Sequence, residues 1–242
     1  MFRKKYYFIF VIFAIVLSLF MLKYCFIKVK AQTNQMINYI NKDGSKYPKI
    51  VAKVGSLEIN NKEFATEVFL IKNKYQNKNE NFYEKEALKN LILNKEYELE
   101  ELKHGLFVTD DEVDAYLKNM ENVYNTMNDK NGDMTKFIQD VKNDGFNNIQ
   151  NFFKNQQIRD TYKKALLRVK LRNYIMNLVD SPTDNDINNF IKDNNLDFSK
   201  TDKNMLKQQL LFKKRIEAWD AYNEQLLKSN NFSIYIPINI NK

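Results

Sequence analysis

Apolar and other residues alternate over two short stretches near residue 50. These are "IVAKV" at residues 50–54 and "LEI" at residues 57–59, and Gly55-Ser56 separates them. Alternation on both sides of a glycine-containing turn predicts a β-hairpin. A hairpin alone is only marginally stable. The β-branched and aromatic segment "FSIYIPINI" at residues 232–240 therefore predicts a third strand, with Ser233–Ile236 paired to the hairpin.

Elsewhere the apolar residues recur at helical spacing, separated by short polar breaks. This pattern predicts seven helices, which cover residues 61–75, 84–103, from 110 onward, 134–143, 147–179, 184–193 and 203–228. The later part of the longest helix is apolar on more than one face, so we expect it to pack between neighbouring elements. The sequence thus predicts a mainly α, multi-helix domain whose small β-hairpin is completed by a C-terminal strand.

Capping residues support several of these boundaries. Asn60 with Glu63, and Thr109 with Glu112, have the spacing of a capping box, although Asn61 is a rival cap for the first helix. Gly105 predicts the end of the helix over residues 84–103. Farther on, Ser181-Pro182-Thr183 ends one helix and caps the next.

A long apolar segment, Tyr6–Ile27, follows a basic N-terminus and predicts a transmembrane helix. Val29-Lys30-Ala31 has small residues where a signal peptidase would cut, but the apolar core is long and stands well back from Ala31, which favours an uncleaved anchor. A lipoprotein signal at Cys25 is excluded because Lys23 and Tyr24 stand where small residues are required. The predicted organisation is a membrane anchor or signal segment at residues 1–30, a polar linker at 31–48 and a helical domain at 49–242.

The net charge of +8 arises mostly beside this apolar segment. Residues 1–30 contain six basic residues and no acidic residue, and the rest of the chain is close to neutral. A nucleic-acid-binding surface would need basic residues gathered on the folded domain. The charge distribution therefore indicates no nucleic-acid partner.

Few residues are candidates for chemistry. Cys25 and His104 are the only cysteine and histidine, so neither a disulfide framework nor a catalytic dyad of these types can form, and His104 is interpreted as a helix-end residue. The acidic pairs Asp110-Asp111 and Asp184/Asp186 stand at predicted helix N-termini, where carboxylates are favourable for structural reasons alone. We predict no catalytic, cofactor-binding or metal-binding residues and no cofactor.

The order of these motifs resembles a known family. "IVAKVGSLEINNKEF", followed by "EALKNLILNKEYELEELKHGLFVTDDEVDAYL", is similar to the N-terminal module of the SurA and PrsA type of extracytoplasmic chaperones and peptidyl-prolyl isomerases. "SPTDNDINNFIKDNN" and "KQQLLFKKRIEAWDAYNEQLLKSNNFSIYI" resemble that family's later segments, so the resemblance spans roughly residues 50–236. Family isomerases carry a parvulin domain before the closing helix, and nothing in this chain resembles its histidine- and glycine-bearing motifs. The resemblance therefore implies a non-enzymatic member.

The function that this resemblance implies is that of a membrane-anchored, non-catalytic holdase, which binds unfolded or secreted polypeptides outside the cytoplasm of a bacterium. Its single-pass anchor would lie in the cell membrane. Two alternatives stay open: an assembly or scaffold protein with one dedicated partner in a secretion or envelope complex, and an active isomerase. Client binding needs exposed apolar or aromatic residues. We expect most of the many aromatic residues to be core residues; these include Phe82, Tyr83, Tyr116, Tyr124, Phe137, Phe146, Phe152 and Phe153.

Overall fold

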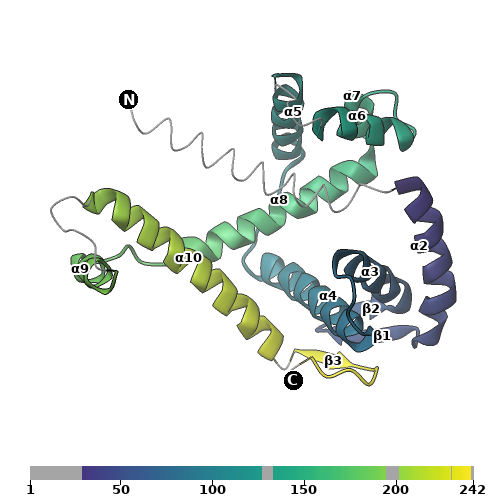
Figure 1. The fold of residues 1–242 in the computed structure, drawn as a ribbon, viewed down its shortest axis with the longest axis horizontal. Helices are drawn as coiled ribbons and strands as arrows, with labels where there is room; N and C mark the ends of the chain where they lie inside the picture. The colour runs from purple at the N-terminus through teal and green to yellow at the C-terminus, as the bar shows by residue number, and fades with distance from the viewer. Residues whose placement is uncertain (1–28, 127–132, 195–201, 230, 241–242) are drawn as a thin grey trace. The chain divides into compact units, whose positions relative to one another are not determined.

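The computed structural model describes residues 29–126, 133–194, 202–229 and 231–240. Helices dominate these residues, and three short strands form one antiparallel sheet (Figure 1). The elements are α2 (Val29–Asp43), a 3₁₀ turn (Gly44–Lys46), β1 (Ile50–Val54), β2 (Leu57–Asn60), α3 (Asn61–Lys74), α4 (Glu80–Lys103), α5 (Asp110–Thr126), α6 (Asp133–Asn143), α7 (Ile149–Lys154), α8 (Gln156–Asn177), α9 (Asp184–Asp193), α10 (Lys203–Lys228) and β3 (Phe232–Ile234). The prediction of a mainly helical fold with a small three-stranded sheet is therefore confirmed.

The predicted transmembrane helix at Tyr6–Ile27 lies outside the described residues. Within the described ranges, no helix is both long enough and apolar enough to cross a membrane.

The described chain forms two compact units. The first contains α2 up to Lys42 and the segment Val108–Leu166, with α5, α6, α7 and the first half of α8. The second contains Asp43–Phe107 and the chain from Leu167 onward, with the sheet, α3, α4, the second half of α8, α9 and α10. Each unit has its own buried core, and the single helical domain over residues 49–242 stays a prediction.

The sheet of the second unit has β1 as its central strand, between β2 and β3. β1 pairs with β2 across the turn, and on its other edge Lys53 lies opposite Ser233 and Ala52 opposite Ile234. Tyr235 also donates its backbone N–H to the carbonyl of Val51 at 2.8 Å. The predicted pairing of the C-terminal strand with the hairpin is thus confirmed.

The turn between β1 and β2 needs a glycine. Of its two residues only Gly55 has a positive φ, +54°, which is the pattern of a type II′ turn. A Cβ at Gly55 would stand 3.0 Å from the side chain of Leu99. Both the backbone conformation and the approach of α4 therefore favour glycine at this position.

A buried carboxylate joins α4 to the C-terminal segment. The Glu96 side chain, on a residue only 3% exposed, accepts hydrogen bonds from Ser229 Oγ at 2.9 Å and from Asn231 Nδ2 at 3.2 Å. Asn231 also accepts the backbone N–H of Gly55 at 2.8 Å. These hydrogen bonds hold the chain after α10 against both α4 and the hairpin turn. β3 begins at the next residue, Phe232.

The core beneath the sheet is built by α3 and α4. Val51, Val54 and Ile59 are fully buried, as are Phe64 and Val68 on α3 and Leu88 and Ile92 on α4. α3 begins as predicted at Asn60, whose side chain accepts the N–H groups of Lys62 and Glu63. The capping box also predicted that the Glu63 side chain would accept the N–H of Asn60. Glu63 instead pairs with Lys95 at 3.0 Å.

Two predicted segments differ in the structure. The linker expected at residues 31–48 contains the helix α2, which its polar composition did not indicate. The single helix expected over residues 147–179 is divided into α7 and α8 at Asn155, whose ψ of 129° is extended. The Asn155 side chain accepts the N–H of Ile158 at 3.3 Å, so it caps the start of α8 instead of continuing α7.

Aromatic rings pack against one another in the core of the first unit. Phe152, which is buried, makes edge-on contacts with Phe137 and Phe146, and Phe153 contacts Tyr162 in the same manner. α5 enters this unit from the predicted cap, where Thr109 and Glu112 exchange hydrogen bonds. Val113, Leu117 and Met120 of α5 are buried in this unit.

Candidate functional site

The end of α4 packs against α8 through a largely buried ion pair. Arg168 Nε lies 3.0 Å from Glu101 Oε1, and the Glu101 side chain is only 6% exposed. The Arg168 guanidinium also lies 3.7 Å from the centroid of the Tyr97 ring, as a cation–π contact. Burial raises the pKa of Glu101, and burial lowers the pKa of Arg168. The pair fixes α8 on α4 within the second unit.

α10 covers the neighbouring face of α4. Trp219 stacks on Tyr97 with ring centroids 5.4 Å apart, and the Tyr97 hydroxyl donates to Asn223 Oδ1 at 2.6 Å. The Tyr222 hydroxyl donates to Glu100 at 2.7 Å. Burial and the neighbouring Glu100 carboxylate raise the pKa of Tyr222. This polar and aromatic interface packs α4, the second half of α8 and α10 together as one support within the second unit.

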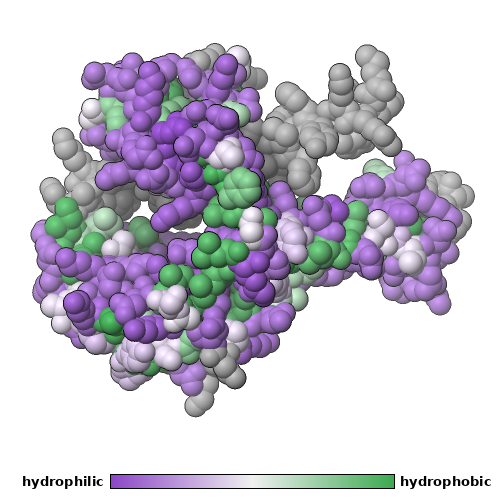
Figure 2. Space-filling view, turned by 180° about the vertical axis from the view of Figure 1, so that it is seen from behind, coloured by the Kyte–Doolittle hydropathy of each residue, from purple (hydrophilic) through white to green (hydrophobic). Residues whose placement is uncertain are grey.

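Beside this support lies a set of exposed apolar side chains. Leu102 at the end of α4, Phe107 in the following loop and Leu178 just after α8 are 75%, 69% and 65% exposed, the highest values among the large apolar residues described. The fourth member, Tyr174 on α8, is also exposed. We call these four residues the α4–α8 apolar surface. Figure 2 shows apolar side chains among the polar ones on the face that it presents.

Two contacts place the loop after α4, which carries Phe107, along the part of α8 that carries Tyr174. Lys170 Nζ donates to the carbonyl oxygen of Phe107 at 2.7 Å, and the His104 and Tyr174 rings are 4.4 Å apart. The segment after α4 therefore runs antiparallel to α8. Leu178 lies one residue beyond the end of α8, four residues after Tyr174. The left-handed φ of Gly105, +61°, lets the chain leave α4 in this direction.

His104 is the C-cap residue of α4, as its position near Gly105 predicts. Its Nε2 lies 3.3 Å from Glu100 Oε2, and its ring contacts Tyr174. These contacts of His104 are thus with a helix-end carboxylate and an aromatic ring. This arrangement resembles a helix-end interaction rather than the nucleophile and base of a catalytic dyad.

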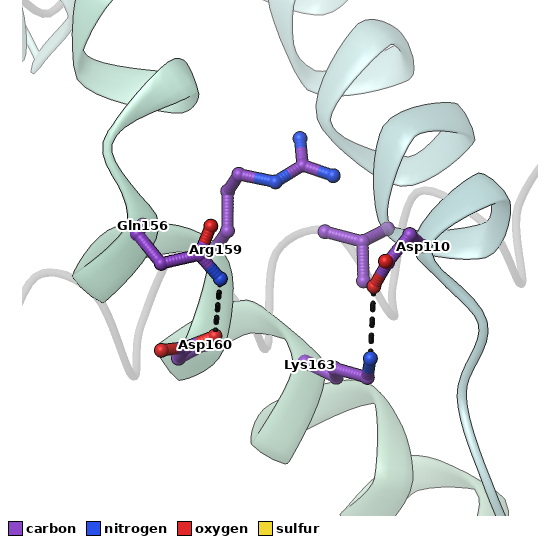
Figure 3. A pocket seen from close by; sticks show the side chains of 6 residues that line it. Asp110, Gln156, Arg159, Asp160 and Lys163 are labelled. Carbon is purple, nitrogen blue, oxygen red and sulfur yellow. Dashed lines mark hydrogen bonds and ion pairs between the residues drawn. The ribbon is translucent and has the colours of Figure 1, made fainter.

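The first acidic pair lies beside a small polar depression of the first unit, drawn in Figure 3. Asp110 pairs with Lys163 at 2.8 Å, and Gln156 donates to Asp160 at 2.8 Å. The depression holds about 40 Å³, room for one or two water molecules. The paired Lys163 lowers the pKa of Asp110. The Asp110–Lys163 pair joins α5 to the first half of α8 within the first unit.

The second acidic pair also has a structural role. Asp186 and Thr183 form a reciprocal capping box at the start of α9, and Lys214 pairs with Asp186 at 3.0 Å. These hydrogen bonds lower the pKa of Asp186 to about 2. Among the residues that the structure describes, no three His, Cys, Asp or Glu side chains are grouped so that they could hold a metal ion.

The eight aromatic residues named from the sequence are core or half-buried residues. Tyr83, Phe152 and Phe153 are buried, and the other five are intermediate in exposure. The exposed aromatic rings are different ones, including Phe107 and Tyr174. The sequence did carry a signal for Phe107, because it lies in the short segment between the helix stop at Gly105 and the helix start at Thr109.

The later part of the longest predicted helix, which is the second half of α8, was expected to pack between neighbouring elements. Leu171 is fully buried and Ile175 nearly so, in a cluster with Tyr97 and Leu226. Val169 and Leu178, however, are 48% and 65% exposed. The expectation is confirmed for Leu171 and Ile175, which pack between α4 and α10, whereas Val169 and Leu178 face solvent.

The fold defines a mainly helical class of domain with one small three-stranded antiparallel sheet. The family model described as the SurA-like N-terminal domain matches residues 1–167. Since the match covers well over half of the chain, the protein belongs to that family. No curated protein and no solved structure shows a significant match. The matched range ends within α8 and includes the hairpin, α3, α4 and α5, on which the resemblance seen in the sequence mainly rests.

Proposed function

We propose that this protein is a non-catalytic holdase that binds unfolded polypeptides through the α4–α8 apolar surface. The observation that carries the proposal is the exposure of Leu102, Phe107 and Leu178, the most exposed large apolar side chains described, in the unit where the buried Arg168–Glu101 pair joins α4 to α8. Membership of the SurA-like N-terminal domain family supports a chaperone-type role.

The physical argument rests on exposure. An apolar side chain held in water costs free energy that is recovered when a partner covers it, about 1.5–3 kcal/mol for each fully buried large residue. A surface of this kind binds apolar segments of many sequences because it requires no fixed hydrogen-bond partners. A stable support keeps the exposed residues from collapsing into the core of their own domain.

The chain between α9 and α10 supports the absence of isomerase activity. Family isomerases hold their parvulin domain there, whereas in this protein only the segment from Asn194 to Asp202 joins the two helices.

The test is suppression of aggregation. Reduced, unfolded lysozyme is diluted into buffer with the full-length protein in lipid nanodiscs, and light scattering is recorded. We expect clear suppression by the unchanged protein, and at least about a threefold weaker effect after the combined replacements Leu102→Ser, Phe107→Ser and Leu178→Ser, since these remove the apolar contact area.

The matched control is Leu70→Ser combined with Tyr235→Ser, two exposed apolar residues away from this surface, at 40% and 52% exposure. This control should suppress aggregation as the unchanged protein does. Equal suppression by both variants would contradict the assigned surface. Absence of any suppression, with one stoichiometric partner recovered from cells, would contradict the holdase and favour the dedicated assembly protein.

We further propose that Tyr6–Ile27 anchors the protein in the bacterial cell membrane, with the domain outside the cytoplasm. The support is the length of the apolar segment and its basic flanks. The anchored protein should stay in the membrane pellet after carbonate extraction, and its intact mass should include the first residues. A mature N-terminus at Gln32 would show that the segment is a cleaved signal.

A further inference from the structure

α10 carries apolar residues at a strict seven-residue interval. Met205, Phe212, Trp219 and Leu226 lie on one side of the helix, because seven residues make nearly two full turns. A seven-residue apolar repeat is the spacing with which one α-helix packs along another. We call this side of α10 the heptad face.

Among the residues that the structure describes, it is the C-terminal half of the heptad face that is covered. Trp219 stacks on Tyr97 of α4, and Leu226 is buried in the cluster that contains Tyr97 and Leu171. Met205 and Phe212, two heptads earlier, are 55% and 45% exposed. The face that binds α4 in one half of α10 therefore continues, with the same spacing, as an exposed face in the other half.

The N-terminal half of α10 is nevertheless held in place. Leu206 and Leu210 are buried against Ile187 and Ile191 of α9. Lys214 pairs with Asp186 of the same helix. Since α9 occupies a different side of α10, it stabilises this half without covering Met205 or Phe212.

The residue beside the exposed face is a cation. Arg215 follows Phe212 by three residues, so it lies next to it on the helix surface. An acidic residue of a partner would neutralise this guanidinium.

We propose that the exposed half of the heptad face, Met205 and Phe212 with Arg215 at its edge, binds an amphipathic α-helix of a partner polypeptide that has a heptad-spaced apolar side and acidic flanks. The partner helix packs along the N-terminal half of α10, next to the C-terminal half that α4 covers. Two observations carry the proposal: the continuity of this face with the α4 interface, and the charge of Arg215. It does not depend on the proposed holdase activity, which uses other residues.

The test measures binding of a synthetic helix directly. A fluorescein-labelled peptide of about three heptads, with Leu at the heptad positions and Glu beside them, is titrated with the full-length protein in lipid nanodiscs, and fluorescence anisotropy is recorded. Empty nanodiscs give the background. We expect saturable binding, and no comparable binding of a peptide with the same composition in shuffled order, which has no apolar side.

Variants then locate the site. Phe212→Ser and, separately, Met205→Ser should each weaken binding by about tenfold, consistent with the loss of one large apolar contact. The control Tyr235→Ser, with a similarly exposed apolar side chain, should not change the affinity. Arg215→Glu should weaken binding of the Glu peptide, and a peptide with Lys in place of Glu should restore it.

Three results would overturn the proposal: no binding above empty nanodiscs, equal binding of the shuffled peptide, or an affinity that neither Phe212→Ser nor Met205→Ser changes. None of these results bears on the suppression of lysozyme aggregation. The proposed holdase activity is therefore tested separately.

Discussion

Deletion of residues 232–242 will lower the free energy of unfolding by about 4 kcal/mol, on the order of losing two or three buried large side chains. The deletion removes β3 and so exposes one edge of the central strand β1, where Ala52 and Lys53 pair with Ile234 and Ser233. It also removes Ile240, which is 6% exposed. A two-stranded hairpin remains, and that is marginal by itself.

Thermal and urea unfolding of the full-length protein and the deletion variant, followed by Trp219 fluorescence and circular dichroism, measure this effect. Ser233→Pro is a smaller change with the same direction, because proline within a paired strand removes a backbone donor. Tyr235→Ser is the control, since its side chain is half exposed. An unchanged unfolding midpoint with native fluorescence would mean that the C-terminal strand contributes nothing to stability.

Arg168→Met will destabilise the second unit by about 3 kcal/mol at neutral pH, at the lower end of the range for breaking a buried ion pair. The replacement keeps most of the side-chain volume but leaves the Glu101 carboxylate without its cation. It also removes the cation–π contact with Tyr97, 3.7 Å from the guanidinium to the ring centroid. Urea unfolding followed by circular dichroism gives the difference in free energy.

Lys163→Met is the matched control on the same helix, because Lys163 pairs with the solvent-exposed Asp110. Exposed pairs contribute little to stability, so this variant should keep the midpoint of the unchanged protein. Equal effects of the two replacements would show that burial of the Arg168–Glu101 pair is not what stabilises the interface.

The effect of Arg168→Met should also depend on pH. Burial already holds the pKa of Glu101 above its ordinary value of 4.5, and loss of Arg168 raises it further. For a group whose folded pKa is raised, the stabilising contribution is present below the unfolded pKa and is lost as the pH rises through the folded pKa. The destabilisation should therefore be smaller near pH 4 than at pH 7.

The caps and the strand pattern were predictable from local sequence because they depend on few neighbouring residues. Thr109 with Glu112 and the alternation on either side of Gly55 each determine a conformation within a few residues. The break at Asn155 was missed for the opposite reason. The apolar spacing on both sides is helical, and only the local hydrogen bond from Ile158 to the Asn155 side chain separates α7 from α8.

The candidate site was less predictable than the fold. Phe107, in the loop after α4, is 69% exposed, and Phe152, in α7, is 1% exposed. Which of two similar side chains is covered depends on elements that are distant in sequence. The sequence therefore predicted that apolar residues exist in excess but not which of them face solvent.

By itself the sequence determined the helical class, the hairpin, the helix caps and the family resemblance, because each follows from spacing over a few residues or turns. Only the tertiary structure decided that Glu96 binds Ser229 and Asn231, that Arg168 is paired with Glu101, and that half of the heptad face of α10 is uncovered. Those features join residues far apart in the chain, and side-chain burial depends on where the helices cross.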